Sequence, residues 1–391
     1  MAIRGIYSKA EEEMLRAENK RLDTIAGWYK PRTDIVATEE SIKKMGLAVD
    51  PWNPLWHDEV YARGTRWGSI IAFPAYQGAF GEPGISELRA SPECGYQYMI
   101  WAGEDWVFYK PIRPGDRLKI WRRRPQLLDV TRIEGDGPRT FGLVEGDMDY
   151  INQHDELVST LKLYVERTFL PEPRTKPVYS MPEYSYTKEE LLYIAKLMQE
   201  EEIRGADIRY WEDVQIGEEM KPIVTGPTTM ADNAIVNAVS PSVGSRMDPR
   251  AIFLSSVGED MGKWIVEDPD TGRYYFTGGP TGRHWSDRAA QAEGEPCAWL
   301  YGVISRFSLL RVITNWMGDD GFLRKFIWRH MARTRVGDTL IGRGKVVGKR
   351  VEKEEYLVDL KVWLENLRGN ISEAAVATVR LCSKEASYLW K

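Results

Sequence analysis

The chain has 391 residues and a formal net charge of −5 at pH 7, and 43% of its residues are hydrophobic. This length predicts two domains of ordinary size or a duplicated one, and the apolar content excludes an intrinsically disordered chain. The acidic balance argues against general binding to nucleic acid or to an anionic membrane surface.

Cysteine usage and apolar runs bear on the compartment. The three cysteines, Cys94, Cys297 and Cys382, are widely spaced and form no CxxC pair, which argues against a disulfide framework and a structural zinc site. No run reaches the ~18 apolar residues of a membrane-spanning helix, and the first residues lack the apolar core of a signal peptide. We therefore expect a soluble, cytoplasmic protein without a membrane or nucleic-acid partner.

The first half of the chain predicts a helical start followed by a sheet. A charged, exposed helix is expected over residues 11–28, and a short helix capped by Thr38 follows it. Residues 77–105 are rich in Gly and Pro and make a poor helix. From Trp106 onwards, β-branched and aromatic residues alternate with polar ones, which predicts strands within 106–124, 139–151 and 156–169.

The second half repeats this order after a proline-rich stretch and a helix over residues 188–203. A strand-like segment over 209–223 precedes a capped helix over 228–239, and a long buried helix comes next. Strands are then expected within 326–346, 355–366 and 373–381.

Two turns support the repeat. Gly115-Asp116 in the first half corresponds to Gly337-Asp338 in the second, and Asn152 and Asn366 each precede a turn and a strand. Repetition on this scale indicates two copies of one unit, each a helix followed by an antiparallel sheet.

Residues 297–317 give the strongest helical signal, because they are apolar on nearly every side and contain no proline. Such a helix is buried, and Pro296 before it and Gly318 after it agree with that span. His284, one of four histidines, lies a short loop upstream. A helix N-terminus carries unpaired N–H groups and a partial positive charge, which suit an oxygen that gains negative charge during a reaction.

The order of helix, histidine motif, buried helix and Gly-Asp turn resembles the MaoC-like hotdog family, which includes R-specific enoyl-CoA hydratases and acyl dehydratases. The N-terminal half is similar to the fatty-acid-synthase-type dehydratase domain. The resemblance implies an α+β tandem hotdog, in which each half is a curved antiparallel sheet wrapped around a central helix. The expected parts are an N-terminal hotdog over 1–170, a linker and crossover helix over 171–205, and a C-terminal hotdog over 206–391 with an insertion over 241–280.

The family's signature is D-x-N-P-x-H-x-D-x-x-x-A, followed twelve residues later by a glycine that opens the central helix. Its chemistry is the reversible addition of water to a trans-2-enoyl thioester. Asp and His hold and deprotonate the water, and the glycine N–H polarises the thioester carbonyl. The resemblance therefore implies a hydro-lyase that acts on an acyl-CoA substrate, with no cofactor and no metal.

The N-terminal half keeps part of this signature and loses its chemistry. Trp56 stands at the histidine position, Pro51 at the aspartate position and Pro74 at the glycine position. Proline has no N–H, so Pro74 cannot donate to an oxyanion. The resemblance leaves this half to substrate binding, with Asn53 and Asp58 as contact residues.

The C-terminal half keeps the histidine, as His284, and the glycine, as Gly302. The resemblance implies that His284 is the acid–base residue, that the Gly302 N–H is the oxyanion donor, and that Trp299 contacts substrate. Gly279 stands where the aspartate is expected, so the acidic partner of His284 stays open. The candidates are Asp287, Asp232, Asp50 and Asp58, of which Asp287 is nearest in sequence.

Several alternatives accompany this interpretation. His284 is equally compatible with a structural role in a Gly-rich loop. The chain as a whole is also compatible with a non-catalytic, acyl-CoA-binding partner subunit of a hydratase complex, or with a thioesterase on the same fold. The aromatic-rich insertion over 241–280 predicts a lid or pocket wall. We expect a homo-oligomer or a hetero-oligomer with another hotdog subunit.

Overall fold

The computed structural model describes residues 31–78, 96–124, 126–132, 140–170, 179–239, 265–267, 271–276, 279–292 and 294–385, together with residues 16, 20, 23, 24 and 177. Its dominant feature is one sheet of eleven antiparallel strands. The first half contributes β1 (Pro31–Val36), β2 (Tyr96–Phe108), β3 (Arg117–Arg122), β4 (Gln126–Arg132), β5 (Thr140–Ile151) and β6 (Leu157–Leu170). The second half contributes β7 (Ile223–Thr225), β10 (Phe322–His330), β11 (Leu340–Glu352), β12 (Glu355–Asn366) and β13 (Ile371–Arg380).

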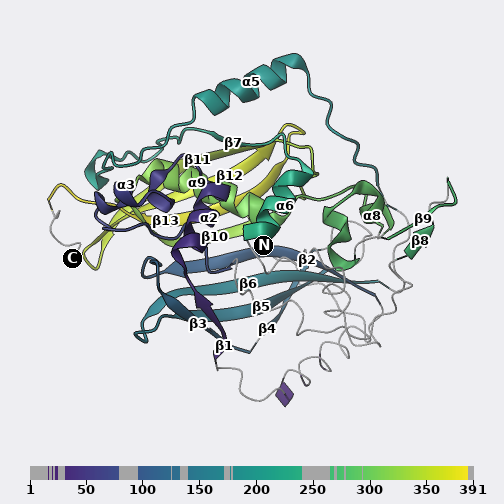
Figure 1. Cartoon of the computed structure of the whole chain (residues 1–391), viewed down its shortest axis with the longest axis horizontal. Helices are drawn as coiled ribbons and strands as arrows, with labels where there is room; N and C mark the ends of the chain where they lie inside the picture. Colours follow the sequence, from purple (N-terminus) through teal and green to yellow (C-terminus); the bar gives the residue numbers. More distant parts are fainter. Residues whose placement is uncertain are drawn as a thin grey trace.

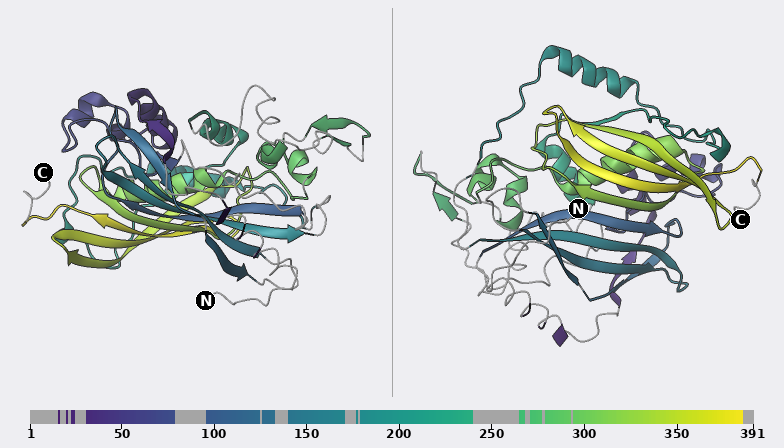
Figure 2. Two further views of the ribbon diagram at one scale, coloured as in Figure 1. Left: turned by 90° about the horizontal axis from the view of Figure 1, so that it is seen from below. Right: turned by 180° about the vertical axis from the view of Figure 1, so that it is seen from behind.

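The strand order shows the duplication that the sequence predicts. It runs β1-β3-β5-β6-β2-β10-β13-β12-β11-β7, with β4 beside β5. The two halves of this order mirror each other about the β2–β10 pair, where Trp106 is opposite Phe326. The two half-sheets are therefore continuous, with the N-terminal half in blue and the C-terminal half in yellow-green (Figure 1; Figure 2, right).

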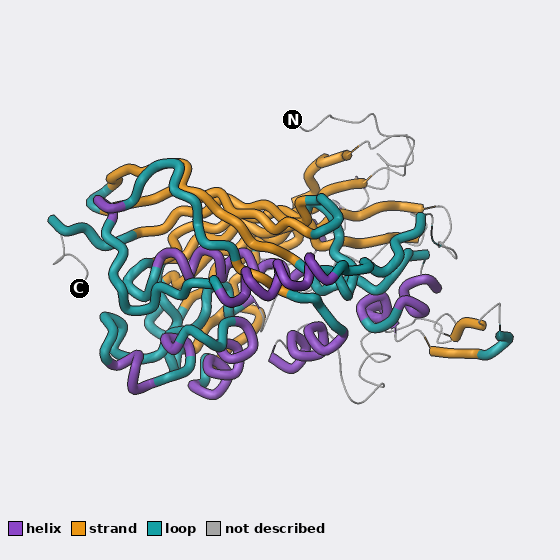
Figure 3. The backbone as a smooth tube through the Cα atoms, turned by 90° about the horizontal axis from the view of Figure 1, so that it is seen from above, coloured by secondary structure: helices purple, strands orange, loops and turns teal. Residues whose placement is uncertain are grey.

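The helices gather mainly on one side of the sheet (Figure 3). The α-helices are α2 (Glu39–Val49), α3 (Glu59–Arg63), α5 (Lys188–Gln199), α6 (Met230–Val239), α8 (Asp287–Ala292) and α9 (Gly302–Met317). Short 3-10 turns are η1 (Pro54–Trp56), η4 (Trp211–Asp213) and η7 (Gly279–His284), and β8 (Ile265–Glu267) and β9 (Tyr274–Phe276) form a separate hairpin. No helix among the described residues is long and apolar enough to cross a bilayer.

The central helix of the C-terminal half is α9. It packs against β7, β10, β11, β12 and β13. Every residue of α9 is buried except Gly302 and Arg311, which are partly exposed. A curved sheet around one buried helix is the arrangement expected of this half. Residues 79–95, which follow Pro74 in the N-terminal half, lie outside the described residues.

The repeated turns have the same hydrogen bonds in both halves. The Asn152 Oδ1 atom accepts from the N–H groups of His154 and Glu156 at 2.9 and 3.0 Å. The Asn366 Oδ1 atom accepts from Arg368 and Asn370 at 3.1 and 3.0 Å. The two asparagines therefore close equivalent turns, which explains why they recur.

One buried carboxylate joins the two half-sheets and α9. Glu104 of β2 is fully buried, and its Oε2 atom accepts from the indole N–H groups of Trp106 at 2.7 Å and Trp328 at 3.0 Å. The Arg306 Nη1 atom of α9 lies 3.0 Å from the Oε1 atom of Glu104. These contacts fix α9 over the β2–β10 junction.

Three of the sequence-based boundaries are wrong. The first long strand begins at residue 96 and not at 106, because a Gly-containing strand is continuous through a bulge at Gly103. Residues 209–222 form turns and η4, and only 223–225 pair as β7. The buried helix begins at Gly302 and not at 297, because residues 297–301 are extended and Trp299 forms a bridge with Arg335. The expected helix over 11–28 lies almost entirely outside the described residues.

Candidate active site

The N-terminus of α9 supplies a backbone donor. Tyr301 is the N-cap residue, with extended backbone angles, and Gly302 is the first helical residue. The first N–H groups of a helix have no acceptor within the helix, and no described residue accepts from the Gly302 N–H. A Cβ atom at Gly302 would lie 3.3 Å from the Trp101 Cε3 atom. Trp101 of β2 therefore brings the N-terminal half up to the start of α9.

His284 lies beside this helix start, as its sequence position predicts. Its Nδ1 atom lies 2.9 Å from the Trp299 carbonyl oxygen, and its ring stacks on Tyr301 with the centroids 4.1 Å apart. A carbonyl oxygen only accepts, so Nδ1 carries the proton in this contact. The Nε2 atom is thereby left as the basic nitrogen.

Asn233 of α6 holds these segments together, although the sequence analysis did not single it out. Its Nδ2 atom donates to the carbonyl oxygens of His284 at 2.8 Å and Trp299 at 3.2 Å. Its Oδ1 atom accepts from the Tyr301 N–H at 3.0 Å. One buried side chain thus fixes the histidine turn relative to the N-terminus of α9. The sequence carries no clear signal for this role, because α6 also contains Asp232 and a second asparagine, Asn237.

The imidazole is held in its neutral form. Burial is the main cause that lowers the pKa of His284, to about 3, and the nearby positive charges of Arg283 and Arg333 act in the same direction. The hydrogen bond to Trp299 opposes this shift. At neutral pH the ring is therefore uncharged.

Asp287 is bound by groups other than His284. Its Oδ1 atom accepts from the Ala298 N–H at 2.7 Å, and its Oδ2 atom lies 2.5 Å from the Arg335 Nη2 atom. The same Arg335 donates to the Met181 carbonyl oxygen at 2.7 Å. Asp287 therefore belongs to a structural network.

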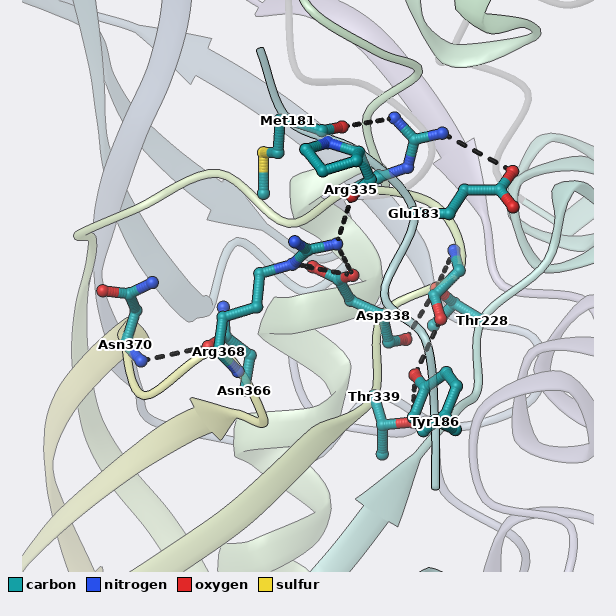
Figure 4. A network of polar contacts seen from close by, with 12 residues as sticks. Met181, Glu183, Tyr186, Thr228, Arg335, Asp338, Thr339, Asn366, Arg368 and Asn370 are labelled. Carbon is teal, nitrogen blue, oxygen red and sulfur yellow. Dashed lines mark hydrogen bonds and ion pairs between the residues drawn. The ribbon is translucent and has the colours of Figure 1, made fainter. Parts of the chain in front are cut away.

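Figure 4 shows how that network continues. Arg368 holds the Asp338 carboxylate with bonds of 2.8 to 3.1 Å, and Tyr186 donates to the Gly337 carbonyl oxygen at 2.7 Å. These contacts tie the segment before α5 to the second Gly-Asp turn. The bonds of Arg335 to Met181 and of Tyr186 to Gly337 thus anchor the linker to the C-terminal half.

The other carboxylate candidates also have local partners. The Asp232 Oδ2 atom accepts from the Thr229 N–H at 2.6 Å, and Asp58 caps α3 by accepting from Val60 and Tyr61. Asp50 is fully buried, accepts from the Trp56 indole at 3.0 Å and lies 3.8 Å from Arg311. None of the bonds formed by these described residues reaches His284.

The proposed substrate contacts have structural roles as well. The Asn53 Oδ1 atom caps η1 by accepting from Leu55 at 3.1 Å. Trp299 is buried, and its indole N–H donates to Glu295 at 2.9 Å. Its carbonyl oxygen is the partner of His284, so Trp299 belongs to the site through its backbone. Among the described residues, no group of three His, Cys, Asp or Glu side chains is placed to hold a metal ion.

Most of the insertion over 241–280 lies outside the described residues. The β8–β9 hairpin is described, and the Tyr274 hydroxyl there donates to Glu267 at 2.9 Å. Tyr274 is largely exposed, so it does not line a buried pocket.

Comparisons with known proteins agree with the fold. Residues 24–161 match the family model described as the FAS1-like, dehydratase domain region. A solved MaoC-like dehydratase superposes with a TM-score of 0.61 at 16% identity, over 92% of this chain and 99% of that chain. This chain has the fold of a MaoC-like dehydratase.

A second MaoC-type structure agrees. The putative MaoC domain protein dehydratase from Chloroflexus aurantiacus J-10-fl superposes with a TM-score of 0.54 at 11% identity, over 92% of this chain and 96% of that chain. Comparison with curated protein sequences gives no match. The predicted resemblance to MaoC-like dehydratases, with an N-terminal half like the fatty-acid-synthase dehydratase domain, is confirmed.

Proposed function

We propose that this tandem hotdog is an acyl-CoA hydratase or dehydratase that adds water reversibly to a trans-2-enoyl-CoA. The observation that carries the proposal is the contact of His284 with Trp299 and Tyr301 at the start of α9. It places a neutral imidazole beside the residue that precedes the Gly302 N–H. A base and an oxyanion donor are the two groups that thioester hydration needs.

The proposed reaction uses these two groups in sequence. The His284 Nε2 atom takes a proton from water as the water oxygen bonds to C3 of the enoyl group. The electron pair of the C2–C3 double bond moves towards the thioester oxygen, where the Gly302 N–H stabilises the negative charge. C2 then takes the proton from His284, which restores the neutral imidazole and the thioester carbonyl. No further cofactor is consumed.

The low pKa of His284 sets an expectation for the rate. A general base works best when its pKa lies near the working pH, and an imidazole with a pKa of about 3 is a weak base. We therefore expect turnover that is slow for this fold. A carboxylate brought close to His284 on substrate binding, or by a second subunit, would raise its pKa and speed the reaction.

The test follows the absorbance of the conjugated enoyl thioester with short, branched and aromatic enoyl-CoAs. We expect hydration by the wild type and a rate at least about a hundredfold lower for His284→Ala, as loss of a general acid–base predicts. His154→Ala is the matched control, because His154 is exposed in a hairpin turn. Equal rates for the wild type and His284→Ala would refute the proposed role.

A second candidate is a non-catalytic acyl-CoA-binding subunit of a hydratase complex. The observation that favours it is the engagement of Asp287 by Arg335 and Ala298, which leaves His284 without the family's acidic partner. Binding of an enoyl-CoA without turnover, together with stimulation of a second hotdog chain, would support it. Release of free thiol in the same assay would instead indicate a thioesterase.

A further inference from the structure

An apolar cavity lies between the two halves, next to the segment of the N-terminal half that has lost the family's catalytic motif. The cavity is lined by Trp56, which stands at the motif's histidine position, and by Pro74, which stands at its glycine position. Phe73, Met317 and Phe322 are among its other walls, and part of it is open to solvent. The two positions at which the N-terminal half lost its catalytic residues, Trp56 and Pro74, therefore line an apolar cavity.

This cavity lies at the opposite end of α9 from His284. It is lined by Met317 and by the residues that follow the helix, whereas His284 stacks on Tyr301 before the helix begins. The helix has sixteen residues, and a rise of ~1.5 Å per residue separates its ends by about 24 Å. A ligand in the cavity is thus remote from the Gly302 N–H.

One polar group in the wall is held in place and incompletely bonded. Asp319 is 3% exposed, its Oδ2 atom accepts from the Tyr61 hydroxyl at 2.6 Å, and its backbone oxygen accepts from the Trp67 indole at 2.7 Å. Its N–H donates to the Gly205 carbonyl oxygen at 2.9 Å. Its Oδ1 atom is buried and no described residue donates to it. Because this atom is inaccessible from the cavity, Asp319 offers a ligand no free acceptor.

The charges favour an uncharged ligand. The described ionisable groups in the wall are Asp319 and Lys110, and the Lys110 Nζ atom lies 2.5 Å from the Glu156 carboxylate. Burial raises the pKa of Asp319, which favours its neutral form. A ligand carboxylate or phosphate would lose its hydration here without gaining an unpaired cation.

We propose that this cavity is a second ligand site, separate from the His284 site, for a small, uncharged and mainly apolar molecule. Its hydrocarbon chain packs among Trp56, Phe73 and Phe322. Medium-chain alcohols have this chemistry, so 1-octanol is a suitable probe.

Calorimetric titration of the full chain with 1-octanol tests the proposal. We expect saturable binding to the wild type and to His284→Ala, and at least tenfold weaker binding of octanoate. Ala72 also lines the cavity, so the larger side chain of Ala72→Phe is expected to weaken octanol binding at least tenfold. Val376→Phe is the matched control, because it adds the same ring at a half-exposed position on β13.

Three results would overturn the proposal. The first is a lack of octanol binding to the wild type. This measurement does not depend on the folding of any variant. The second is octanol binding that is lost in His284→Ala or that competes with a short enoyl-CoA. The third is an Ala72→Phe variant that raises KM for long enoyl-CoAs alone, since the cavity would then be the end of the substrate channel. Octanol binding is measured without turnover, so its outcome is distinct from that of the hydratase assay.

Discussion

At the scale of single residues, His284 links pH to stability. The folded protein holds its pKa at about 3, against an ordinary value of 6.5. Between pH 6.5 and pH 3, His284 is therefore protonated in the unfolded chain but neutral in the folded protein. The free energy of unfolding should fall between pH 6.5 and 3, by at most about 1.4 kcal/mol per pH unit from this group.

We expect His284→Asn to remove this dependence, since an asparagine N–H can donate to the same Trp299 carbonyl oxygen but does not titrate. Urea denaturation at pH 7.5 and 5.0 measures it. The wild type should lose about 1–2 kcal/mol more than the variant over this interval. Other titrating groups cancel in the comparison, so equal losses would mean that His284 is protonated in the folded protein.

Gly302 allows a direct test of the backbone donor. It is the first residue of α9, where proline is tolerated, and Tyr301 before it is already in the extended conformation that a following proline requires. Gly302→Pro therefore removes the N–H with little cost to the helix. Gly302→Ala is the control, because it crowds Trp101 in the same way and keeps the N–H.

We expect kcat for Gly302→Pro to be about 10²–10³ lower than for Gly302→Ala, the range found when an oxyanion donor is removed. Steady-state kinetics with the best enoyl-CoA measures it, and thermal denaturation confirms that both variants fold. Similar kcat values in the two variants would show that another group stabilises the oxyanion.

At the scale of elements, the end of α9 could be predicted from the local sequence, whereas the apolar run misplaced its start and only the family resemblance put the helix-opening glycine at Gly302. Gly318 follows Met317 with a φ of 71°, a conformation in which glycine is favoured. The end of the helix can therefore be recognised from the local sequence. Residues 297–301 are as apolar as the helix itself, and periodicity does not separate a buried extended segment from a buried helix. Their conformation depends on the bridge from Trp299 to Arg335, which is a long-range contact.

Some features of the candidate site could likewise be predicted from the sequence, and others could not. The spacing predicted that His284 lies near the start of the buried helix, and its ring stacks on Tyr301, the residue before Gly302. The engagement of Asp287 by Arg335, 48 residues away, had no local signal. Asn233 was missed because a buried asparagine within a helix belongs to no motif, although it bonds three segments of the site.

The junction of β2, β10 and α9 gives a prediction at this scale. Glu104→Leu removes the acceptor of two indole N–H groups and the carboxylate beside Arg306. Breaking a buried pair in this way costs about 3–5 kcal/mol, and urea denaturation measures the loss. Asp105→Ala is the control, because Asp105 pairs with the partly exposed Arg329 and accepts from the Tyr164 hydroxyl at 2.8 Å. Its loss should cost less, about 1–2 kcal/mol.

The double variant Glu104→Leu/Arg306→Met completes this test. We expect it to regain a large part of the lost stability, since it removes the buried charge together with its partner. A double variant that is no more stable than Glu104→Leu would mean that the carboxylate acts through Trp106 and Trp328 alone.

At the scale of the whole molecule, the continuous sheet couples the two halves. β2 pairs with β10 over five residue pairs from Lys325↔Val107 to Arg329↔Gly103, and Trp101 of one half packs on Gly302 of the other. We expect both halves to unfold in one transition. Urea curves from far-ultraviolet circular dichroism and tryptophan fluorescence should coincide, and two separated transitions would contradict this coupling.

The edges of the sheet have a consequence for self-association. An open sheet edge presents unpaired backbone groups on which further strands can add. Here β7 at one end has three residues and packs against α5, and β1 at the other end has six residues and begins with Pro31, which has no N–H. These two edge strands therefore present few unpaired backbone groups with which another strand could pair. The duplicated sheet is therefore protected from edge-to-edge aggregation at β1 and β7, and assembly of several copies would use other surfaces.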